Sequence, residues 1–163
     1  MIVIVSDTSV LIDLERGELL EAAFSCGLTM AVPDLLYQIE LAPYNGEYLQ
    51  NLGLGVLALG PSEVALAQTI KNERNALSLP DCFALSCALR ADYALVTGDK
   101  LLRTEAERRS AQVYGLLWVL DQMANSRVIA VEPLREGLTK ITGYARCRLP
   151  KSEVANRLDR WKD

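Results

Sequence analysis

Short runs of apolar residues alternate along the chain with longer segments in which apolar residues recur every three or four positions. An apolar run without alternation is typical of a strand buried on both faces, as in a parallel sheet. The longer spacing indicates helices that pack through one face. The predicted strands are Met1–Val5, Leu28–Val32, Gly55–Leu59, Ala94–Thr97 and Ala111–Tyr114. Strands alternating with helices predict an α/β fold with a mostly parallel sheet.

Helices are expected between and after these strands. Ser62 is a favourable N-cap, and Pro80 suits a first helical turn because its missing N–H costs nothing there. The expected helical segments are Val10–Leu14 with a continuation over Leu19–Phe24, then Asp34–Leu41, Ser62–Ile70, Asp81–Ala91, Lys100–Arg109, Gly115–Met123, a helix from Pro133, and Ser152–Trp161. We expect one domain over residues 1–145 and a basic helical tail of the same domain over residues 146–163, joined through Tyr144–Pro150.

The composition narrows the chemistry. The 163 residues are 50% hydrophobic, which suffices for one buried core. The absence of histidine excludes Ser–His–Asp hydrolases, Cys–His proteases and histidine-ligated zinc. The four cysteines form no C-x-x-C pair, and Cys82 and Cys87, in an apolar run, are expected to be reduced, buried thiols. With no signal peptide and no transmembrane run, we expect a cytoplasmic protein.

Charge is distributed unevenly. Residues 1–99 hold 4 basic and 13 acidic residues, a net charge of −9, and residues 100–163 hold 13 basic and 8 acidic residues, a net charge of +5. Such a chain suits a protein that gathers a cation at one place and contacts a polyanion at another. Asymmetry of this size also occurs in ordinary proteins.

Four acids fall where an α/β sheet places its ligands. Asp7 directly follows the first strand, Asp99 follows Ala94–Thr97 across one glycine, Asp81 opens the helix before that strand, and Glu40 lies in the helix after the second strand. If strands 1, 2 and 4 are neighbours, these side chains meet beyond their carboxyl ends. Crowded carboxylates require raised pKa values or a cation. Oxygen ligands select Mg²⁺ or Mn²⁺, which can activate a water toward a phosphodiester without histidine.

Each acid also has a purely structural interpretation. Asp7 and Asp99 can be N-caps, Asp81 can stabilise the dipole of its helix, and Glu40 can be a solvated helix residue. The pattern around all four acids weighs against these interpretations.

That pattern resembles the PIN domain family. The segments IVSDTSVLIDL around Asp7, VPDLLYQIE ending at Glu40, LPDCFALSCAL beginning at Asp81 and ALVTGDKLL around Asp99 match it in order and spacing over about residues 1–120. The remainder, from YGLLWVL to GYARCRLPKSE, looks like the longer bacterial and archaeal PIN-type proteins. Many relatives are VapC-like toxin ribonucleases of toxin–antitoxin pairs.

The resemblance implies a three-layer α/β/α sandwich and a Mg²⁺- or Mn²⁺-dependent nuclease acting on RNA. Asp7, Glu40, Asp81 and Asp99 are the implied catalytic and metal-binding acids. Thr8, Ser9 and Thr97 match the hydroxyl-bearing positions that support them. Some members carry a further acid shortly after the Thr-Gly-Asp segment; Lys100 follows here, and Glu105 is the candidate substitute.

Basic residues downstream are candidate substrate contacts. Lys100 and Arg103 lie on the helix that begins at Asp99, with Arg108 and Arg109 one turn further on. More distant candidates in the tail are Arg146, Arg148, Lys151, Arg157 and Arg160, with Trp161 as a stacking platform or a partner anchor. A solvated helical face is the alternative for the tail.

The leading hypothesis is a metal-dependent endoribonuclease, with a role as the toxin of a toxin–antitoxin pair as one form of it. The partners are then a small antitoxin protein and, in a homodimer, a second copy of the chain. The alternative is a non-catalytic PIN-like module that binds RNA or a protein. A receiver-like phosphoacceptor domain ranks low, because the third predicted strand ends in Leu59–Gly60–Pro61 without an acid.

Overall fold

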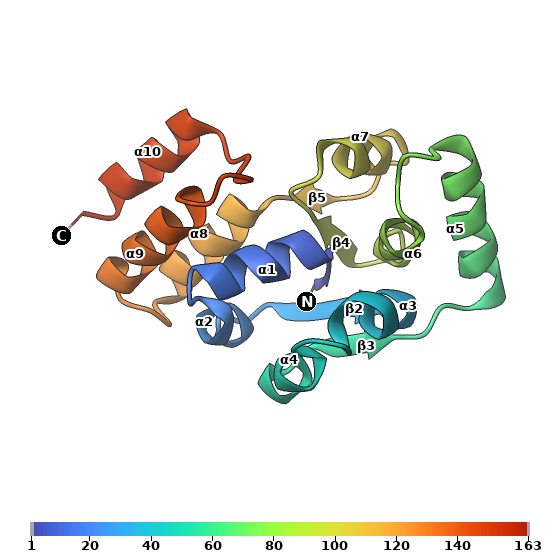
Figure 1. The fold of residues 1–163 in the computed structure, drawn as a ribbon, viewed down its shortest axis with the longest axis horizontal. Helices are drawn as coiled ribbons and strands as arrows, with labels where there is room; N and C mark the ends of the chain where they lie inside the picture. The colour runs from blue at the N-terminus through green and yellow to red at the C-terminus, as the bar shows by residue number, and fades with distance from the viewer. Residues whose placement is uncertain (1, 163) are drawn as a thin grey trace.

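A computed structural model describes residues 2–162 and places a parallel sheet at the centre of the molecule (Figure 1). The five strands lie in the order β3-β2-β1-β4-β5, and every neighbouring pair is parallel. Their bounds are Val3–Ser6 for β1, Thr29–Pro33 for β2, Gly55–Leu57 for β3, Tyr93–Val96 for β4 and Val113–Tyr114 for β5. The predicted α/β fold with a parallel sheet is therefore confirmed.

The strand order reverses between β1 and β4. The chain first builds the sheet outward from β1 to β2 and β3, then returns to place β4 on the other side of β1. Ser6 pairs with Val96 at the last register position of this junction. Connections on the two sides of such a reversal diverge, which leaves a crevice at the carboxyl ends of the two strands. The expectation that strands 1, 2 and 4 are neighbours is confirmed.

Helices cover the sheet on both sides. The bounds are Thr8–Arg16 for α1, Leu20–Ser25 for α2, Asp34–Leu36 for α3, Tyr37–Leu41 for the π-helical turn η1, Gly46–Leu52 for α4, Pro61–Glu73 for α5, Leu79–Ala88 for α6, Lys100–Arg108 for α7, Leu116–Ser126 for α8, Val131–Thr142 for α9 and Lys151–Arg160 for α10. In Figure 1, α1, α2, α8 and α9 lie on one side of the strands, and α5 and α6 lie on the other.

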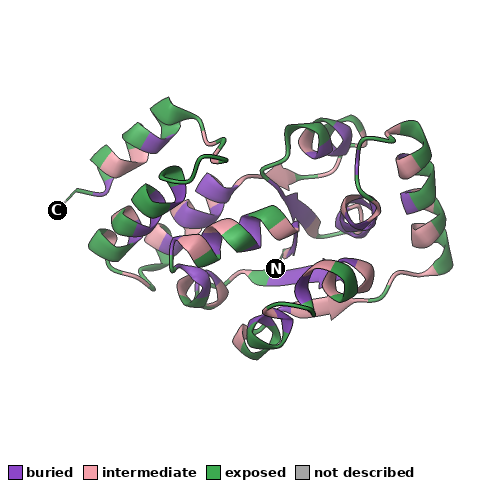
Figure 2. Ribbon diagram, in the orientation of Figure 1, coloured by how far each residue is buried: buried purple, intermediate pink, exposed green. Residues whose placement is uncertain are grey.

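The core lies between the sheet and these helices. Ile4, Val5 and Leu95 in the central strands are fully buried, and nearly every residue of α6 is buried as well (Figure 2). The continuous apolar character of α6 follows from its position, because it packs against β1, β2 and β4 while α5 covers its outer side. Cys82 and Cys87 belong to this buried helix and are free thiols, as the sequence predicts.

The sequence locates every strand, with small errors at the ends. The third strand ends at Leu57 and the fifth begins at Val113, so both are shorter than predicted. The helix expected over Asp34–Leu41 is one α-helical turn that continues as a π-helical turn from Tyr37. Helix α4 is missing from the prediction, because Gly46 and Asn45 read as turn residues.

The C-terminal helices pack on the α1 side of the molecule. α9 crosses α1 closely, since Gly137 lies against Gly17 and Leu19 with no room for a side chain. α10 is held on α8 and α9 by an ion pair from Arg157 to Asp121 and by the buried ring of Trp161. Trp161 is thus a core anchor, which corrects its expected role as a stacking platform or partner anchor. Within residues 2–162, every helix is too short or too polar to cross a membrane.

Candidate functional site

The four acids singled out in the sequence line one hollow at the carboxyl edge of the sheet. Its volume is about 290 Å³, and Thr8, Ser9, Ile12 and Ser78 complete its lining beside Asp7, Glu40, Asp81 and Asp99. Each acid arrives from a different part of the fold: the end of β1, the π-helical turn, the first turn of α6, and the loop after β4. The reversal of strand order between β1 and β4 places Asp7 and Asp99 beside each other.

Asp7 is the most deeply buried of the four acids in the hollow, with only 3% of its surface exposed. It is the N-cap of α1: its Oδ1 accepts hydrogen bonds from Val10 N (3.0 Å) and the Ser9 hydroxyl (2.9 Å), and its Oδ2 accepts one from the Thr97 hydroxyl. Burial raises the pKa of Asp7, the hydrogen bonds of Thr97, Val10 and Ser9 oppose that rise, and the charge of Asp99 adds to it. Asp7 therefore caps α1 and has a carboxyl group whose ionisation is opposed by burial.

Asp99 begins α7 and is held by the same threonine. Its Oδ1 caps the helix by accepting from Leu102 N at 2.9 Å, and its own N–H donates to Thr97 Oγ1 at 3.0 Å. Oδ2 of Asp99 has no hydrogen-bond partner within residues 2–162, which leaves one oxygen available at the hollow. The structural and the chemical interpretations of Asp7 and Asp99 are thus compatible, because one carboxylate can cap a helix and still present an oxygen.

Glu40 enters the hollow from an irregular helix. The α-helical turn after β2 widens into the π-helical turn Tyr37–Leu41, and such turns are frequent where a side chain must be re-aimed. The Thr8 hydroxyl donates to Glu40 Oε2, which ties this turn to the start of α1. The ring of Tyr37 occupies the space beside Gly46, where an added Cβ would lie 2.9 Å from it. Packing of Tyr37 on α4 therefore fixes the turn that carries Glu40.

Asp81 is the acid whose ionisation responds most clearly to its neighbours. Burial and the negative charge of Asp7 raise its pKa to about 6, with smaller contributions from Glu40 and Asp99, while a hydrogen bond with Ser78 lowers it. Asp81 needs no helix-capping role, because the Ser78 side chain already caps α6 by accepting from Asp81 N at 3.2 Å. Three like charges acting on one carboxylate show that the four acids share a single electrostatic environment.

The donor set suits a hard cation. None of the four acids has a lysine or arginine ion-pair partner within residues 2–162, so their charge is offset only by hydroxyl and backbone donors. Carboxylate and hydroxyl oxygens are the ligands that Mg²⁺ and Mn²⁺ prefer. As placed, no three carboxylate or thiolate groups of the described chain stand close enough to hold one ion together. Magnesium commonly takes only one or two carboxylates and completes its shell with water, so the oxygen set fits such an ion.

The basic residues expected to contact substrate do not line the hollow. Lys100 is exposed at the start of α7, and Arg103 lies 3.8 Å from Glu107 on the same helix. Arg108 and Arg109 turn away to pair with Glu105 and Glu73. Both arginines thus already pair with carboxylates, and their expected role as phosphate contacts stays a prediction.

Glu105, the candidate substitute for a further acid, does not line the hollow. It is buried, with 1% of its surface exposed, and Arg74, Arg108 and Arg109 contact its carboxylate at 3.0, 3.2 and 2.9 Å. Burial raises the pKa of Glu105, but the hydrogen bonds of Arg109 and Arg108 outweigh this and the pKa lies below its ordinary value. A carboxylate neutralised by three guanidinium groups does not replace a missing metal ligand, so the further acid has no substitute at this position.

Two lining residues were not singled out in the sequence. Ser78 had a visible signal, because a serine two positions before a proline and three before an acid is a typical N-cap. Ile12 had no such signal in the sequence. It is 43% exposed and lines the hollow because of the way α1 packs.

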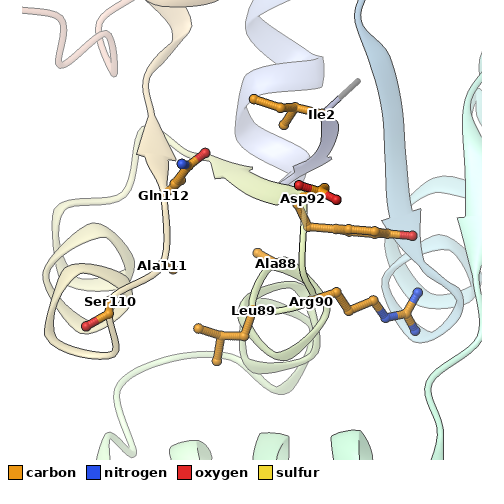
Figure 3. Close-up of a pocket in the computed structure, with 9 residues that line it drawn as sticks. Ile2, Ala88, Leu89, Arg90, Asp92, Ser110, Ala111 and Gln112 are labelled. Atoms are coloured by element: carbon orange, nitrogen blue, oxygen red, sulfur yellow. The ribbon is translucent and has the colours of Figure 1, made fainter.

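A separate hollow of about 240 Å³ lies at the opposite edge of the sheet, where β4 begins (Figure 3). Arg90, Asp92 and Gln112 supply its polar groups, and Ala88, Leu89 and Ala111 its apolar wall. Arg90 is already committed to Glu63 through two hydrogen bonds of 2.6 and 2.9 Å. This hollow therefore lies away from the four acids and lacks a comparable group of free charges.

Comparison with known proteins agrees with the fold. A search of curated proteins found no match. The family model DUF3368, described as a PIN domain, matches residues 3–163 and so extends through α8, α9 and α10, beyond the region of about 1–120 in which the sequence motifs lie. Because the match covers nearly the whole chain, the protein belongs to the PIN domain family.

Proposed function

We propose that this protein is a Mg²⁺- or Mn²⁺-dependent endoribonuclease. The observation that carries the proposal is the convergence of Asp7, Glu40, Asp81 and Asp99 on one hollow without a cationic partner from the described chain. Membership of the PIN domain family, whose members are usually nucleases, supports it. The absence of histidine is consistent with chemistry that relies on carboxylates and a metal ion.

Each residue has a definite task in this proposal. Asp7, Glu40, Asp81 and Asp99 are the candidate ligands, of which one or two would hold the ion while water completes its shell. A bound ion lowers the pKa of a coordinated water and neutralises charge on the scissile phosphate. Thr97 and Ser9 orient the carboxylate of Asp7, and Thr8 orients that of Glu40. Because the pKa of Asp81 is about 6, its carboxylate becomes fully available as a ligand only above that pH.

The test is divalent-dependent cleavage of RNA by the purified protein. We expect Asp7→Asn and Asp99→Asn to lower kcat by at least about a hundredfold, since each removes a charge next to the reacting phosphate. Glu47→Gln, an exposed acid on α4, is the matched control and should cut at the wild-type rate. Equal cleavage by wild type and both aspartate variants would defeat the proposal.

One observation favours a second candidate, a non-catalytic module that binds RNA or a protein. As the side chains of residues 2–162 are placed, three carboxylates do not converge tightly enough to hold an ion among them. Titration with Mn²⁺ separates the two candidates. Binding that is lost in Asp7→Asn and Asp81→Asn supports the nuclease, whereas a wild-type protein that binds no Mn²⁺ but retains RNA supports the module.

The biological partners are a further part of the proposal. We expect a homodimer and, if the protein is a toxin, a small antitoxin protein that covers the acidic hollow. A short reading frame immediately upstream that encodes this partner, and its co-purification with the chain, would support the toxin role. Unrestricted growth of cells that express the chain alone would argue against it.

A further inference from the structure

A second groove adjoins the acidic hollow and is lined by arginines. Its volume is about 370 Å³, and it shares Ser9, Ile12 and Asp99 with the hollow of the four acids. Arg16 of α1 enters it from one side. Arg146 and Arg148, from the connection between α9 and α10, enter it from another. The two hollows are therefore continuous, with acids at one end and guanidinium groups at the other.

Arg146 and Arg148 differ from most arginines of the chain in having no partner. The guanidinium groups of Arg74, Arg90 and Arg157 are each paired with a carboxylate at 3.0 Å or less. Neither Arg146 nor Arg148 makes an ion pair or a hydrogen bond through its side chain within residues 2–162. Asp13 and Asp99 also line the groove, but Asp13 pairs with Arg16 at 3.9 Å and neither acid forms an ion pair with Arg146 or Arg148. Two cations without an ion pair attract an anion.

The backbone of this connection is held in place although its arginines are free. The guanidinium carbon of Arg16 lies 4.3 Å from the ring centroid of Tyr144, and Cys147 N donates to Tyr144 O at 3.0 Å. Cys147 and Leu149 pack against the core, while Arg146 and Arg148, at the alternate positions, are exposed. Because of this alternation both arginines point outward from one anchored segment, and they form one wall of the groove.

The groove also offers apolar surface. Ile12, Leu116 and Leu149 are the apolar residues that line it. A nucleotide presents an anionic phosphate and an apolar base face together, and the base face is accessible only in a single strand. A purely acidic polymer such as polyglutamate would satisfy the arginines but has no group for the apolar wall.

We propose that this groove, formed by Arg16, Arg146 and Arg148 with the apolar side chains that line it, binds the backbone and one base of single-stranded RNA next to the acidic hollow. The inference rests on the proposed nuclease function and assigns the substrate subsite of that reaction. Arg146 and Arg148 are positioning residues: they hold the phosphates that flank the scissile bond and do not touch the reacting atoms.

Binding is measured by fluorescence anisotropy with a labelled single-stranded RNA of about 12 nucleotides, a length within the range of known single-strand sites. The protein is the Asp81→Asn variant in EDTA, so that no strand is cut. Adding Arg146→Gln and Arg148→Gln should raise Kd at least about tenfold and reduce the salt slope by about 1 to 1.5, as expected for two lost phosphate contacts. Duplex RNA and a polyglutamate of equal charge should compete at least about tenfold less well than the single strand.

The matched control removes two charges elsewhere. Arg127→Gln with Lys140→Gln changes two exposed basic residues, one at the end of α8 and one on α9, and should alter Kd by less than about threefold. Equal losses in the two double variants would overturn the proposal, because the effect would then be one of net charge. Polyglutamate that competes as well as RNA would overturn it in favour of a protein ligand.

Cleavage kinetics separate this inference from the proposed function. In the otherwise wild-type protein with Mn²⁺, Arg146→Gln with Arg148→Gln should raise KM about tenfold and leave kcat within about twofold. Metal-dependent cleavage with an unchanged KM would sustain the nuclease and overturn the groove. Arginine-dependent binding by a protein that cuts no RNA would sustain the groove and overturn the nuclease.

Discussion

The Thr97 hydroxyl donates a hydrogen bond to Oδ2 of Asp7, a residue 90 positions earlier in the chain. The same oxygen of Thr97 accepts the N–H of Asp99 at 3.0 Å. One side chain at the end of β4 therefore joins two acids of the candidate site across the junction of β1 and β4. Thr97 is 1% exposed, so water cannot replace either hydrogen bond.

Replacing Thr97 with valine preserves its shape and removes both hydrogen bonds. We expect Thr97→Val to lower the free energy of unfolding by about 1–3 kcal/mol, the cost of leaving buried polar groups without partners. It should also raise the pKa of Asp7 further and move the onset of Mn²⁺ binding to higher pH, because the Thr97 hydrogen bond opposes the effect of burial. Urea unfolding and Mn²⁺ titration across a pH series measure these effects.

Two other threonine variants test that explanation. Thr97→Ser keeps the hydroxyl and should recover most of the lost affinity for Mn²⁺. Thr104→Val removes an exposed hydroxyl that donates only to Lys100 O and should leave Mn²⁺ binding unchanged. A Thr97→Val protein with wild-type stability and metal binding would show that the two hydrogen bonds are unimportant.

The ionisation of Asp81 makes the metal-free protein less stable as the pH rises. Its pKa is raised from 3.8 to about 6 in the folded protein, so the folded state holds a proton that the unfolded chain has released between these values. The free energy of unfolding should therefore fall between about pH 4 and pH 6 and change little above that range on account of this group. Asp7, whose pKa is also raised, acts in the same direction.

Asp81→Asn should remove that loss. Near pH 8 we expect the variant to be more stable than wild type by about 1–2 kcal/mol, a figure reduced for the partial solvent exposure of the carboxylate, and near pH 4 about equal to it. Chemical denaturation in EDTA at both pH values measures the difference, with Glu47→Gln as the control. A variant that is destabilised at both pH values would contradict the assigned cause.

Glu105 should behave as a structural residue. Glu105→Gln leaves Arg74, Arg108 and Arg109 around a neutral group and should cost about 2–3 kcal/mol of stability, since removing one partner of a buried ion pair leaves the other charges uncompensated. Its affinity for Mn²⁺ should equal that of wild type. Glu107→Gln, on the exposed side of α7, should affect neither property. Loss of Mn²⁺ binding in a folded Glu105→Gln protein would restore this residue as a ligand candidate.

The crossing of α1 and α9 depends on a glycine. A Cβ at Gly137 would lie 2.7 Å from Leu19 Cδ1 and 2.8 Å from Gly17 O. Gly137→Ala should therefore cost about 1–3 kcal/mol, as overpacking does in other cores. Thermal unfolding compared with Thr139→Ala, an exposed change on the same helix, measures it. An unchanged melting temperature for Gly137→Ala would mean that α9 shifts without cost.

The fold was predictable where local pattern and tertiary position agree. Strands buried on both faces are visible in the sequence as apolar runs. Asp7 and Asp99 come just after two of these runs, so the candidate site could be located from the sequence. The partners of the charged groups could not. Arg108 and Arg109 read as free cations on a helix, and only the approach of α5, which brings Glu73 and Arg74 to Glu105, shows that they are neutralised.

The same limit applies to the end of the chain. The basic residues there form one group in the sequence, yet α10 pairs Arg157 with Asp121 and leaves Arg146 and Arg148 free. The π-helical turn that carries Glu40 was also hidden, because residues Tyr37–Leu41 have the spacing of an ordinary helix. Which charge is satisfied, and where a helix widens, depends on contacts between segments that the linear pattern does not encode.

The arginine wall of the groove comes late in the chain, whereas all four acids precede residue 100. A ribosome therefore delivers every carboxylate of the hollow before it has synthesised Arg146 or Arg148. During translation the acidic end can assemble on the completed sheet while the wall that faces it is still missing. The groove proposed to hold RNA is therefore completed later in synthesis than the acidic hollow.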